Sequence, residues 1–292
     1  MGLFDIFSGG GSSRKSFSDL SDNWEKRKEA REYNARAREI IDDYTERYET
    51  TYYNTQDYAF ETQRRLDKHN DFKKEIIRKL QLDVKPVLDD FKKFDIDSKT
   101  IDIDFSDIGS NKNLDMSISN INNTFARFDR LSFNNCFPNL DDIFRDATEE
   151  YYQAKSNYNQ AKMYKSQIQL KREQLKTIKS NLSNIRSYIS DEERVLSELM
   201  ERIEGISNKL DQNMKKSSFK KEESEHLKAI YKIAKGIDKM MGTRFLNDDF
   251  TVTDDYNSLF EKMKEINSLI EKPTLNTGEL DRILKSIGVI VY

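Results

Sequence analysis

The chain of 292 residues has few of the residues that interrupt helices or form disulfides. It contains three prolines and ten glycines, so long uninterrupted helices are expected. A single cysteine, Cys136, excludes an internal disulfide framework and favours the cytosol as the compartment. Hydrophobic residues make up 36% and charged residues 35% of the chain, a poor balance for one compact core but sufficient for paired helices.

Two further absences limit the kinds of partner. No apolar stretch reaches the roughly 18 residues of a membrane-spanning helix, and the first 15 residues lack the basic and long apolar regions of a secretory signal. We therefore expect a cytoplasmic protein. The net charge of -3 comes from 49 basic and 52 acidic residues, so the chain lacks the basic excess of a general nucleic-acid binder, and nucleic acid is not the expected partner.

Residues for catalysis or metal binding are also scarce. Glu223 and His226 have the Glu-x-x-His spacing of helical di-iron bundles, but Leu66 occupies the matching position before His69, so the required second copy is missing. The acidic residues from Asp95 to Asp107 lack the order of a calcium loop. No Gly-rich phosphate loop, nucleophile elbow or Cys-x-x-Cys pair occurs. We expect neither an enzyme nor a bound cofactor or metal.

The dominant feature of the sequence is a heptad pattern between Leu140 and Leu210. Apolar residues recur there at steps of three and four, and from Tyr164 onward only Lys171 and Glu192 interrupt the series. Such a seam makes one helix supercoil against another. The predicted fold class is all-α: an elongated antiparallel coiled-coil hairpin of two long helices, with short accessory helices. A small β element at one end is a further expectation, with Ile101 to Phe105, Phe250 to Thr253 and Gly288 to Tyr292 as its candidate strands.

Five regions follow from the pattern of apolar residues and breakers. They are an apolar N-terminal tip with a Gly/Ser joint (1–13), a first long helix (14–94), a mixed connecting segment (95–138), a long coiled-coil helix (139–214) and a C-terminal helical region with an apolar tail (215–292). Pro86 predicts a kink or a break near the end of the first helix.

Charge supports pairing of the two long helices within one chain. In an antiparallel register whose paired residue numbers add up to about 222, residues 155–186 with a net charge of +7 face residues 36–67 with a net charge of -3. Opposite signs are preferred at the flanks of paired helices. Pairing between two chains is the alternative.

The tip carries four large apolar side chains within seven residues: Leu3, Phe4, Ile6 and Phe7. Their full burial would supply about 6 to 12 kcal/mol before ordering costs, which is the scale of a reversible membrane anchor. The start resembles short membrane-active peptides that begin Gly-Leu-Phe-Asp. Docking of the tip on the protein itself or in the groove of a partner protein is the alternative.

A basic surface is the second candidate site. It comprises Lys155, Lys162, Lys165, Lys171, Arg172, Lys176, Lys179 and Arg186. These residues could hold an anionic lipid surface or nucleic-acid phosphates, or they could serve the pairing of helices or face solvent.

The sequence therefore predicts a non-enzymatic coiled-coil scaffold that associates with an anionic membrane surface through its tip. It would lie on the inner face of the membrane, as a homo-oligomer. In outline it resembles phage-shock and BAR-type membrane-shaping proteins, which combine a terminal amphipathic element with long antiparallel helices. The alternatives are a soluble assembly adaptor that docks its tip and tail into partner proteins, and an α-helical pore-forming toxin.

Overall fold

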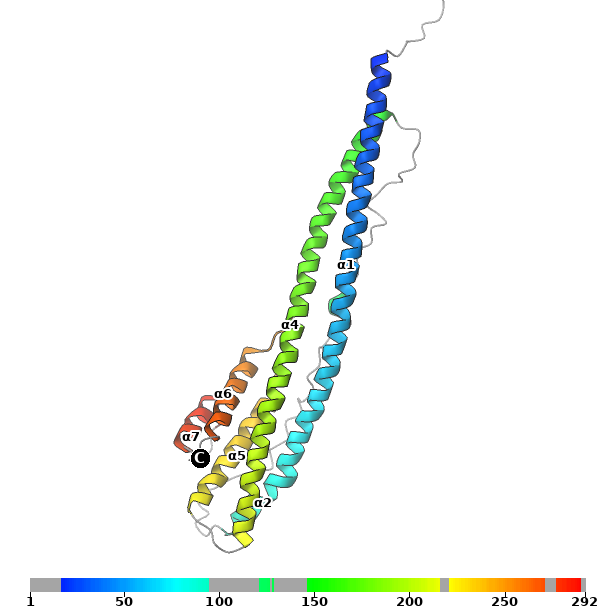
Figure 1. Ribbon diagram of the computed structural model, residues 1–292. Helices are drawn as coiled ribbons and strands as arrows, with labels where there is room; N and C mark the ends of the chain where they lie inside the picture. The colour runs from blue at the N-terminus through cyan, green and yellow to red at the C-terminus, as the bar shows by residue number, and fades with distance from the viewer. Residues whose placement is uncertain are drawn as a thin grey trace, which may run out of the picture. The chain divides into compact units, whose positions relative to one another are not determined.

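The computed structural model describes residues 17–94, 121–126, 128, 146–215, 221–270 and 277–289. Within these ranges the regular elements are helices: α1 (Phe17–Lys79), the π-helix η1 (Leu80–Val84), α2 (Lys85–Phe94), α3 (Ile121–Ala126), α4 (Ala147–Lys215), α5 (Lys221–Met241), α6 (Asp254–Ile270) and α7 (Thr277–Ser286) (Figure 1). The predicted all-α class with two long helices is confirmed.

The chain divides into two units. Unit 1 comprises Met1–Asn54 and Thr124–Lys176, and unit 2 comprises Thr55–Asn123 and Thr177–Tyr292. The long helices α1 and α4 contribute one part to each unit, and within each unit the two helices pack against each other. Unit 2 also contains η1, α2 and the C-terminal helices α5, α6 and α7.

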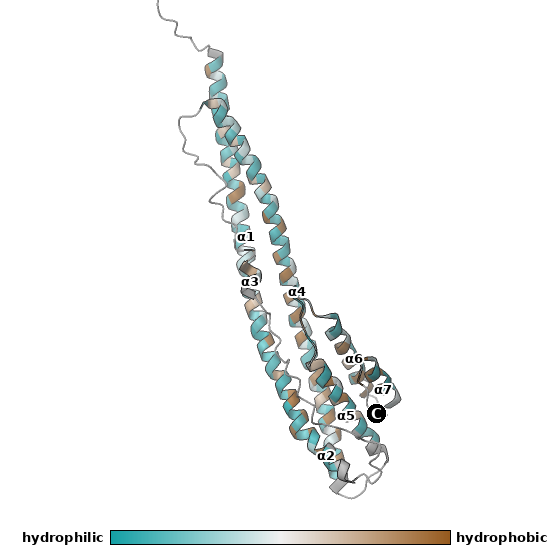
Figure 2. Cartoon of the chain, turned by 180° about the vertical axis from the view of Figure 1, so that it is seen from behind, coloured by the Kyte–Doolittle hydropathy of each residue, from teal (hydrophilic) through white to brown (hydrophobic). Residues whose placement is uncertain are grey.

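The seam of α4 follows a strict seven-residue repeat. Ten buried positions make up the repeat: Ala147, Ala154, Ala161, Ile168, Leu175, Leu182, Ile189, Leu196, Ile203 and Leu210. Figure 2 shows the same pattern as hydrophobic residues that recur along a largely hydrophilic helix. Seven residues make almost two turns of an α-helix, so residues of this repeat lie on one narrow stripe of α4, which packs against its partner helix.

The two long helices run in the same direction within each unit, so the predicted antiparallel orientation is wrong. The contacts that show this are Lys26–Thr148, Asn34–Asn157 and Thr51–Arg172 in unit 1, and Arg65–Glu193 and Lys79–Glu204 in unit 2. Partner numbers rise together, with a separation of 121 to 128 residues, whereas in an antiparallel pair one number would fall as the other rises. In Figure 1, α1 passes from blue to cyan in the direction in which α4 passes from green to yellow. The resemblance to proteins built on antiparallel helices therefore loses its geometric basis.

Unit 1 has a seam of small and aromatic residues. Ala30 and Ala37 of α1 are buried, as are Ala154 and Ala161 of α4. Larger contacts come from aromatic rings, including those of Tyr33 with Tyr151 and Tyr158, and that of Tyr52 with Phe125 of α3. Small residues let the helix backbones approach each other, and the aromatic side chains supply most of the large apolar surface.

In unit 2 the helix continues through Pro86. Proline has no backbone N–H, so the carbonyl four residues before it loses its usual partner. The π-helix η1 lies at this point, and the N–H of Lys85 bonds to the carbonyl of Leu80. A wider turn thus accommodates the proline, and the predicted break is replaced by a local change of hydrogen-bond pattern.

The C-terminal helices form their own apolar core in unit 2. Gly236 lies where α5 meets α6 and α7, because an added Cβ would be 3.3 Å from both Leu284 and Met263. The α6 helix starts with a Thr253 cap, whose hydroxyl accepts the N–H of Tyr256. Gly288 has φ +71° and closes α7, with its N–H bonded to the carbonyl of Lys285.

The described residues contain no strand, so the predicted β element is reduced to one bridge. Val252 pairs with Leu246 in an isolated antiparallel bridge, and Phe250 at the turn has φ 64°. Residues 101–105 and 290–292, the other parts of the predicted sheet, lie outside the described residues. The segment from Leu246 to Val252 is thus a tight turn between α5 and α6 and does not form a sheet.

Candidate functional site

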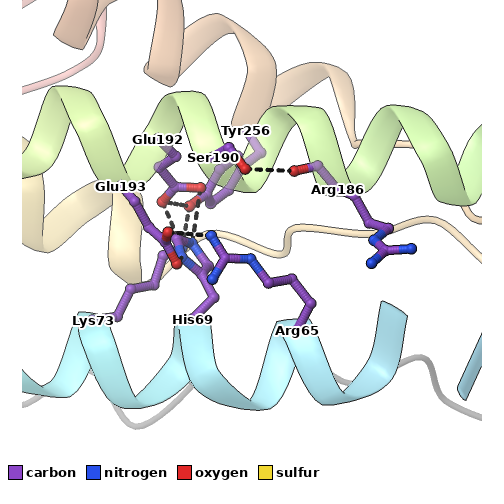
Figure 3. A network of polar contacts seen from close by, with 8 residues as sticks. All are labelled: Arg65, His69, Lys73, Arg186, Ser190, Glu192, Glu193 and Tyr256. Atoms are coloured by element: carbon purple, nitrogen blue, oxygen red, sulfur yellow. Dashed lines mark hydrogen bonds and ion pairs between the residues drawn. The ribbon is translucent and has the colours of Figure 1, made fainter. Parts of the chain in front are cut away.

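A cluster of buried polar side chains joins three helices of unit 2. Glu192 occupies a seam position of α4, His69 and Lys73 occupy seam positions of α1, and Tyr256 comes from the first turn of α6 (Figure 3). Glu192 and His69 are 0% exposed, and Lys73 is 2% exposed. Burial of this many polar groups requires that each find partners.

Glu192 is the centre of the cluster. Its Oε1 lies 2.8 Å from Nζ of Lys73 and accepts a hydrogen bond from the hydroxyl of Tyr256. Its Oε2 lies 3.2 Å from Nε2 of His69. Lys73 also donates to the hydroxyl of Tyr256. One carboxylate therefore connects α1, α4 and α6.

A second carboxylate continues the network toward the surface. Glu193 lies 3.2 Å from Nδ1 of His69 through Oε1, and its Oε2 accepts a hydrogen bond from Arg65. The side chains of Glu193 and Arg65 are 22% and 35% exposed, so water reaches this part. The imidazole of His69 thus lies between a buried carboxylate and a partly solvated one.

Burial and charge act in opposite directions on Glu192. Burial would raise its pKa, but the positive charge of Lys73 and the contact with His69 lower the pKa to about 2. Burial lowers the pKa of Lys73, and attraction to Glu192 offsets part of that change. Burial and the nearby carboxylate raise the pKa of Tyr256 well above its ordinary value. Glu192 is therefore ionised at neutral pH, and Tyr256 keeps its proton and donates it in a hydrogen bond.

Aromatic rings enclose the cluster on the side of the C-terminal helices. Nζ of Lys73 lies 4.7 Å from the ring centre of Tyr256 and 5.7 Å from that of Phe245, and Tyr188 packs on Phe260 at 4.7 Å. The central carboxylate is closed off from solvent, because Glu192 is 0% exposed. The arrangement is suited to holding the three helices together.

Sequence reasoning noted Glu192 only as an interruption of the seam and missed its partners. The signal was present, because Thr55, Ala59, Thr62, Leu66, His69, Lys73, Ile76 and Leu80 follow steps of four and three along α1 and are all buried. A lysine and a histidine at seam positions of one helix, with a glutamate at a seam position of the other, predict a buried ion pair once the register is known.

The eight predicted basic residues lie along α4 and separate into two groups. Four of them recur every seven residues beside the seam: Lys165, Arg172, Lys179 and Arg186. Lys165 lies over the ring of Tyr44 at 5.0 Å, Arg172 donates to the hydroxyl of Thr51, and Lys179 and Arg186 lie 5.5 and 4.7 Å from the ring centre of Tyr58. This group contacts the facing helix.

The remaining predicted basic residues make contacts within α4 or lie at the seam. Lys155 and Lys162 lie over Tyr151 and Tyr158, one turn before them, and Lys176 pairs with Glu173 at 2.7 Å. Lys171 is half-buried. Of the eight, Arg186 forms a described ion pair with α1, to Glu61 at 3.4 Å. The eight basic residues thus differ in their contacts, and four of them contact α1.

The predicted tip, Leu3, Phe4, Ile6 and Phe7, lies outside the described residues. The described part of α1 that follows it exposes two large apolar side chains, Leu20 at 54% and Trp24 at 68%. They are four residues apart and therefore share one face of the helix. Slightly further along α1, Lys26 donates to Thr148 in the first turn of α4.

Other candidate features of the described residues are weaker. A groove of about 440 Å³ lies between α6 and α7, and charged side chains line most of it, including Lys264, Glu265 and Arg282. Within the described ranges, no cluster of three or more His, Cys, Asp or Glu side chains could hold a metal ion. None of the helices in this part of the chain is both long enough and apolar enough to cross a bilayer.

Comparison of the chain with protein-family models, with curated proteins and with solved structures found no match.

Proposed function

We propose that the protein is a non-enzymatic coiled-coil scaffold that associates peripherally with a membrane surface through its N-terminal end. The observation that carries the proposal is the exposure of Leu20 and Trp24 on one face of α1. Exposed large apolar side chains that gather on one surface mark contact sites for proteins or membranes. Tryptophan is enriched at the interface between lipid and water, because its ring is apolar and its N–H is polar.

The apolar tip precedes this face in the sequence. Leu3, Phe4, Ile6 and Phe7 are followed by three glycines and two serines, and α1 begins at Phe17. A tip and a helical face that both enter the interface would add their apolar areas, at about 1.5 to 3 kcal/mol for each fully buried side chain. Two such elements give firmer attachment than the tip alone.

We expect attraction between the basic residues of α4 and anionic lipid to contribute less to membrane binding than the sequence suggested. Four of the eight basic residues of α4 contact α1, and cations already engaged with tyrosine rings or hydroxyls add less to lipid binding. Residues 17–32 carry five acids and four bases, so the exposed face is not strongly basic. Apolar insertion is therefore the main source of affinity, and a modest dependence on anionic lipid is expected.

Trp24 is the only tryptophan in the chain, so its fluorescence reports on this face alone. With vesicles of phosphatidylglycerol and phosphatidylcholine, we expect the emission to shift to the blue and to be quenched by brominated lipid. Co-sedimentation with the same vesicles measures binding directly. We expect Leu20→Asp and Phe4→Asp to weaken binding at least fivefold.

Leu82→Asp is the matched control, because Leu82 is 59% exposed and lies in unit 2. This variant should bind vesicles like the unchanged chain. If the full chain stays in the supernatant and the emission of Trp24 does not shift, the membrane proposal is wrong. In that case the same exposed face favours the alternative of an adaptor that docks into a partner protein.

A further inference from the structure

The outer surface of α4 in unit 1 carries an uncharged stripe beside the seam. Gln160, Met163, Gln167, Leu170 and Gln174 follow each other at steps of three and four, and all five are exposed. Met163 is 66% exposed and Leu170 is 63% exposed. In a chain with 35% charged residues, five consecutive positions of one helix face without a charge stand out. We call these five residues the glutamine stripe.

The heptad position of the three glutamines is covered in the other part of α4, whereas the position of Met163 and Leu170 leads to Thr177, Asn184 and Asp191, which are exposed. Seven-residue steps from Gln174 lead to Asn181, Tyr188, Val195 and Arg202 in unit 2, and Val195 is buried. Asn181 donates to the carbonyl of Asp249, Tyr188 packs on Phe260, and Arg202 donates to the carbonyl of Asn267. In unit 2 this heptad position of α4 is therefore a helix-packing surface, and the three glutamines of the stripe continue it along one uninterrupted helix.

The order of residues in the glutamine stripe is the same in both directions. It reads glutamine, apolar, glutamine, apolar, glutamine, with Gln167 at the centre. A two-fold contact between identical chains requires a surface that is complementary to itself. An arrangement that is symmetric about one residue meets this requirement when the two helices run in opposite directions.

We propose that two copies of this chain pair through the glutamine stripe, with their α4 helices antiparallel and a two-fold axis beside Gln167. Met163 of one copy then lies against Leu170 of the other, and Gln160 lies against Gln174. Gln167 of one copy faces Gln167 of the other. Each side-chain amide has both donors and acceptors, so the two side chains hydrogen-bond to each other. Apolar layers supply the affinity, and glutamine layers specify the register at a cost in stability.

The neighbouring residues are compatible with the antiparallel direction. Asn159, Ser166 and Glu173 flank the glutamine stripe on one side. In the antiparallel pair Glu173 faces Asn159 of the other copy. In a parallel two-fold pair this flank would instead face the opposite flank of the other copy. With two apolar layers between three polar ones, the contact is reversible and depends on concentration.

Sedimentation velocity without lipid tests this pairing independently of the proposed membrane function. We expect a reversible equilibrium between monomer and dimer in the full chain. Leu170→Glu should raise the dissociation constant at least tenfold, because it places charge in an apolar layer. Gln169→Glu, an exposed neighbour with the same new charge on another side of α4, should leave the constant unchanged. Circular dichroism of the variants checks that the helices stay intact.

Disulfide cross-linking identifies the axis. In a chain with Cys136→Ser, Gln167→Cys should form a covalent dimer on mild oxidation, and Gln169→Cys should form far less. A chain that is monomeric at every concentration would overturn the proposal, and so would a dimer that is unaffected by Leu170→Glu or equally weakened by Gln169→Glu.

Discussion

Lys73 of α1 and Glu192 of α4 form an ion pair that is closed off from water, with 2.8 Å between Nζ and Oε1. The two residues are 2% and 0% exposed and both lie at seam positions. A buried pair of this kind costs desolvation energy, which the hydrogen bonds of Tyr256 and the contact of His69 with Glu192 help to offset. The ion pair and its partners come from α1, α4 and α6. Loss of the pair should therefore affect the packing of all three helices in unit 2.

The first prediction concerns removal of the anion. Glu192→Gln leaves the Lys73 cation buried without a counter-charge, and we expect a loss of about 3 to 5 kcal/mol of unfolding free energy. Chemical denaturation followed by circular dichroism measures it. Glu193→Gln, at a residue whose side chain is 22% exposed, should cost about 1 kcal/mol or less. The double variant Lys73→Met with Glu192→Leu should lose less than Glu192→Gln, and an equal or larger loss would show that the ion pair itself is not the cause.

Stability should fall in acid through the same carboxylate. The pKa of Glu192 is about 2 in the folded protein, below its ordinary value of 4.5. A lowered acid pKa adds stability that is complete above pH 4.5 and is lost as the pH falls toward 2, by about 3 kcal/mol for this difference. Denaturation curves at steps between pH 5 and pH 2 measure the slope. Glu192→Gln should remove this part of the pH dependence, and an unchanged slope would contradict the assignment.

The direction of the long helices can be tested by designed disulfides. Asn157 donates to Asn34 at 3.2 Å, so Asn34→Cys with Asn157→Cys should form a disulfide within one chain when Cys136 is replaced by serine. The antiparallel register would instead bring residue 65 near residue 157. Arg65→Cys with Asn157→Cys is therefore the control and should stay reduced. Gel mobility and peptide mass distinguish the products, and the opposite result would restore the antiparallel hairpin.

Two leucines of α4 provide a matched test of the seam. Leu182 is 0% exposed and Leu170 is 63% exposed. We expect Leu182→Ala to lower the unfolding free energy by about 2 to 5 kcal/mol, because it leaves a cavity. Leu170→Ala should change it by about 0.5 kcal/mol or less in dilute solution. Thermal and chemical denaturation of both variants measure the difference, and similar losses would mean that the seam is misplaced.

The seam of α4 could be predicted from the sequence because it depends on local spacing alone. Ile168, Leu175, Leu182 and Ile189 are buried as expected. The stripe of α1 was harder to identify, since it includes Thr55, Thr62, His69 and Lys73, which are polar. Tyr58 and Phe72 are large aromatic residues of the same helix, yet they are only half-buried.

The direction of pairing could not be derived from charge. An antiparallel register around 222 sets residues 155–186 against 36–67, while the separation of 122 residues seen for Lys26 and Thr148 sets them against 33–64. Both directions bring nearly the same acidic block to the basic one. Charge therefore favours pairing of the two helices but does not distinguish the two orientations.

The buried cluster also determines how the two long helices align along their lengths. If α1 slid by one heptad past α4 in unit 2, Glu192 would meet Thr62 and Leu66, or Ile76 and Leu80, in place of His69 and Lys73. Either shift would bury the carboxylate of Glu192 among uncharged side chains and leave Lys73 without its counter-ion. A repeating apolar seam alone would allow several alignments of α1 along α4 that differ by whole heptads. This single ionic layer allows only one of them.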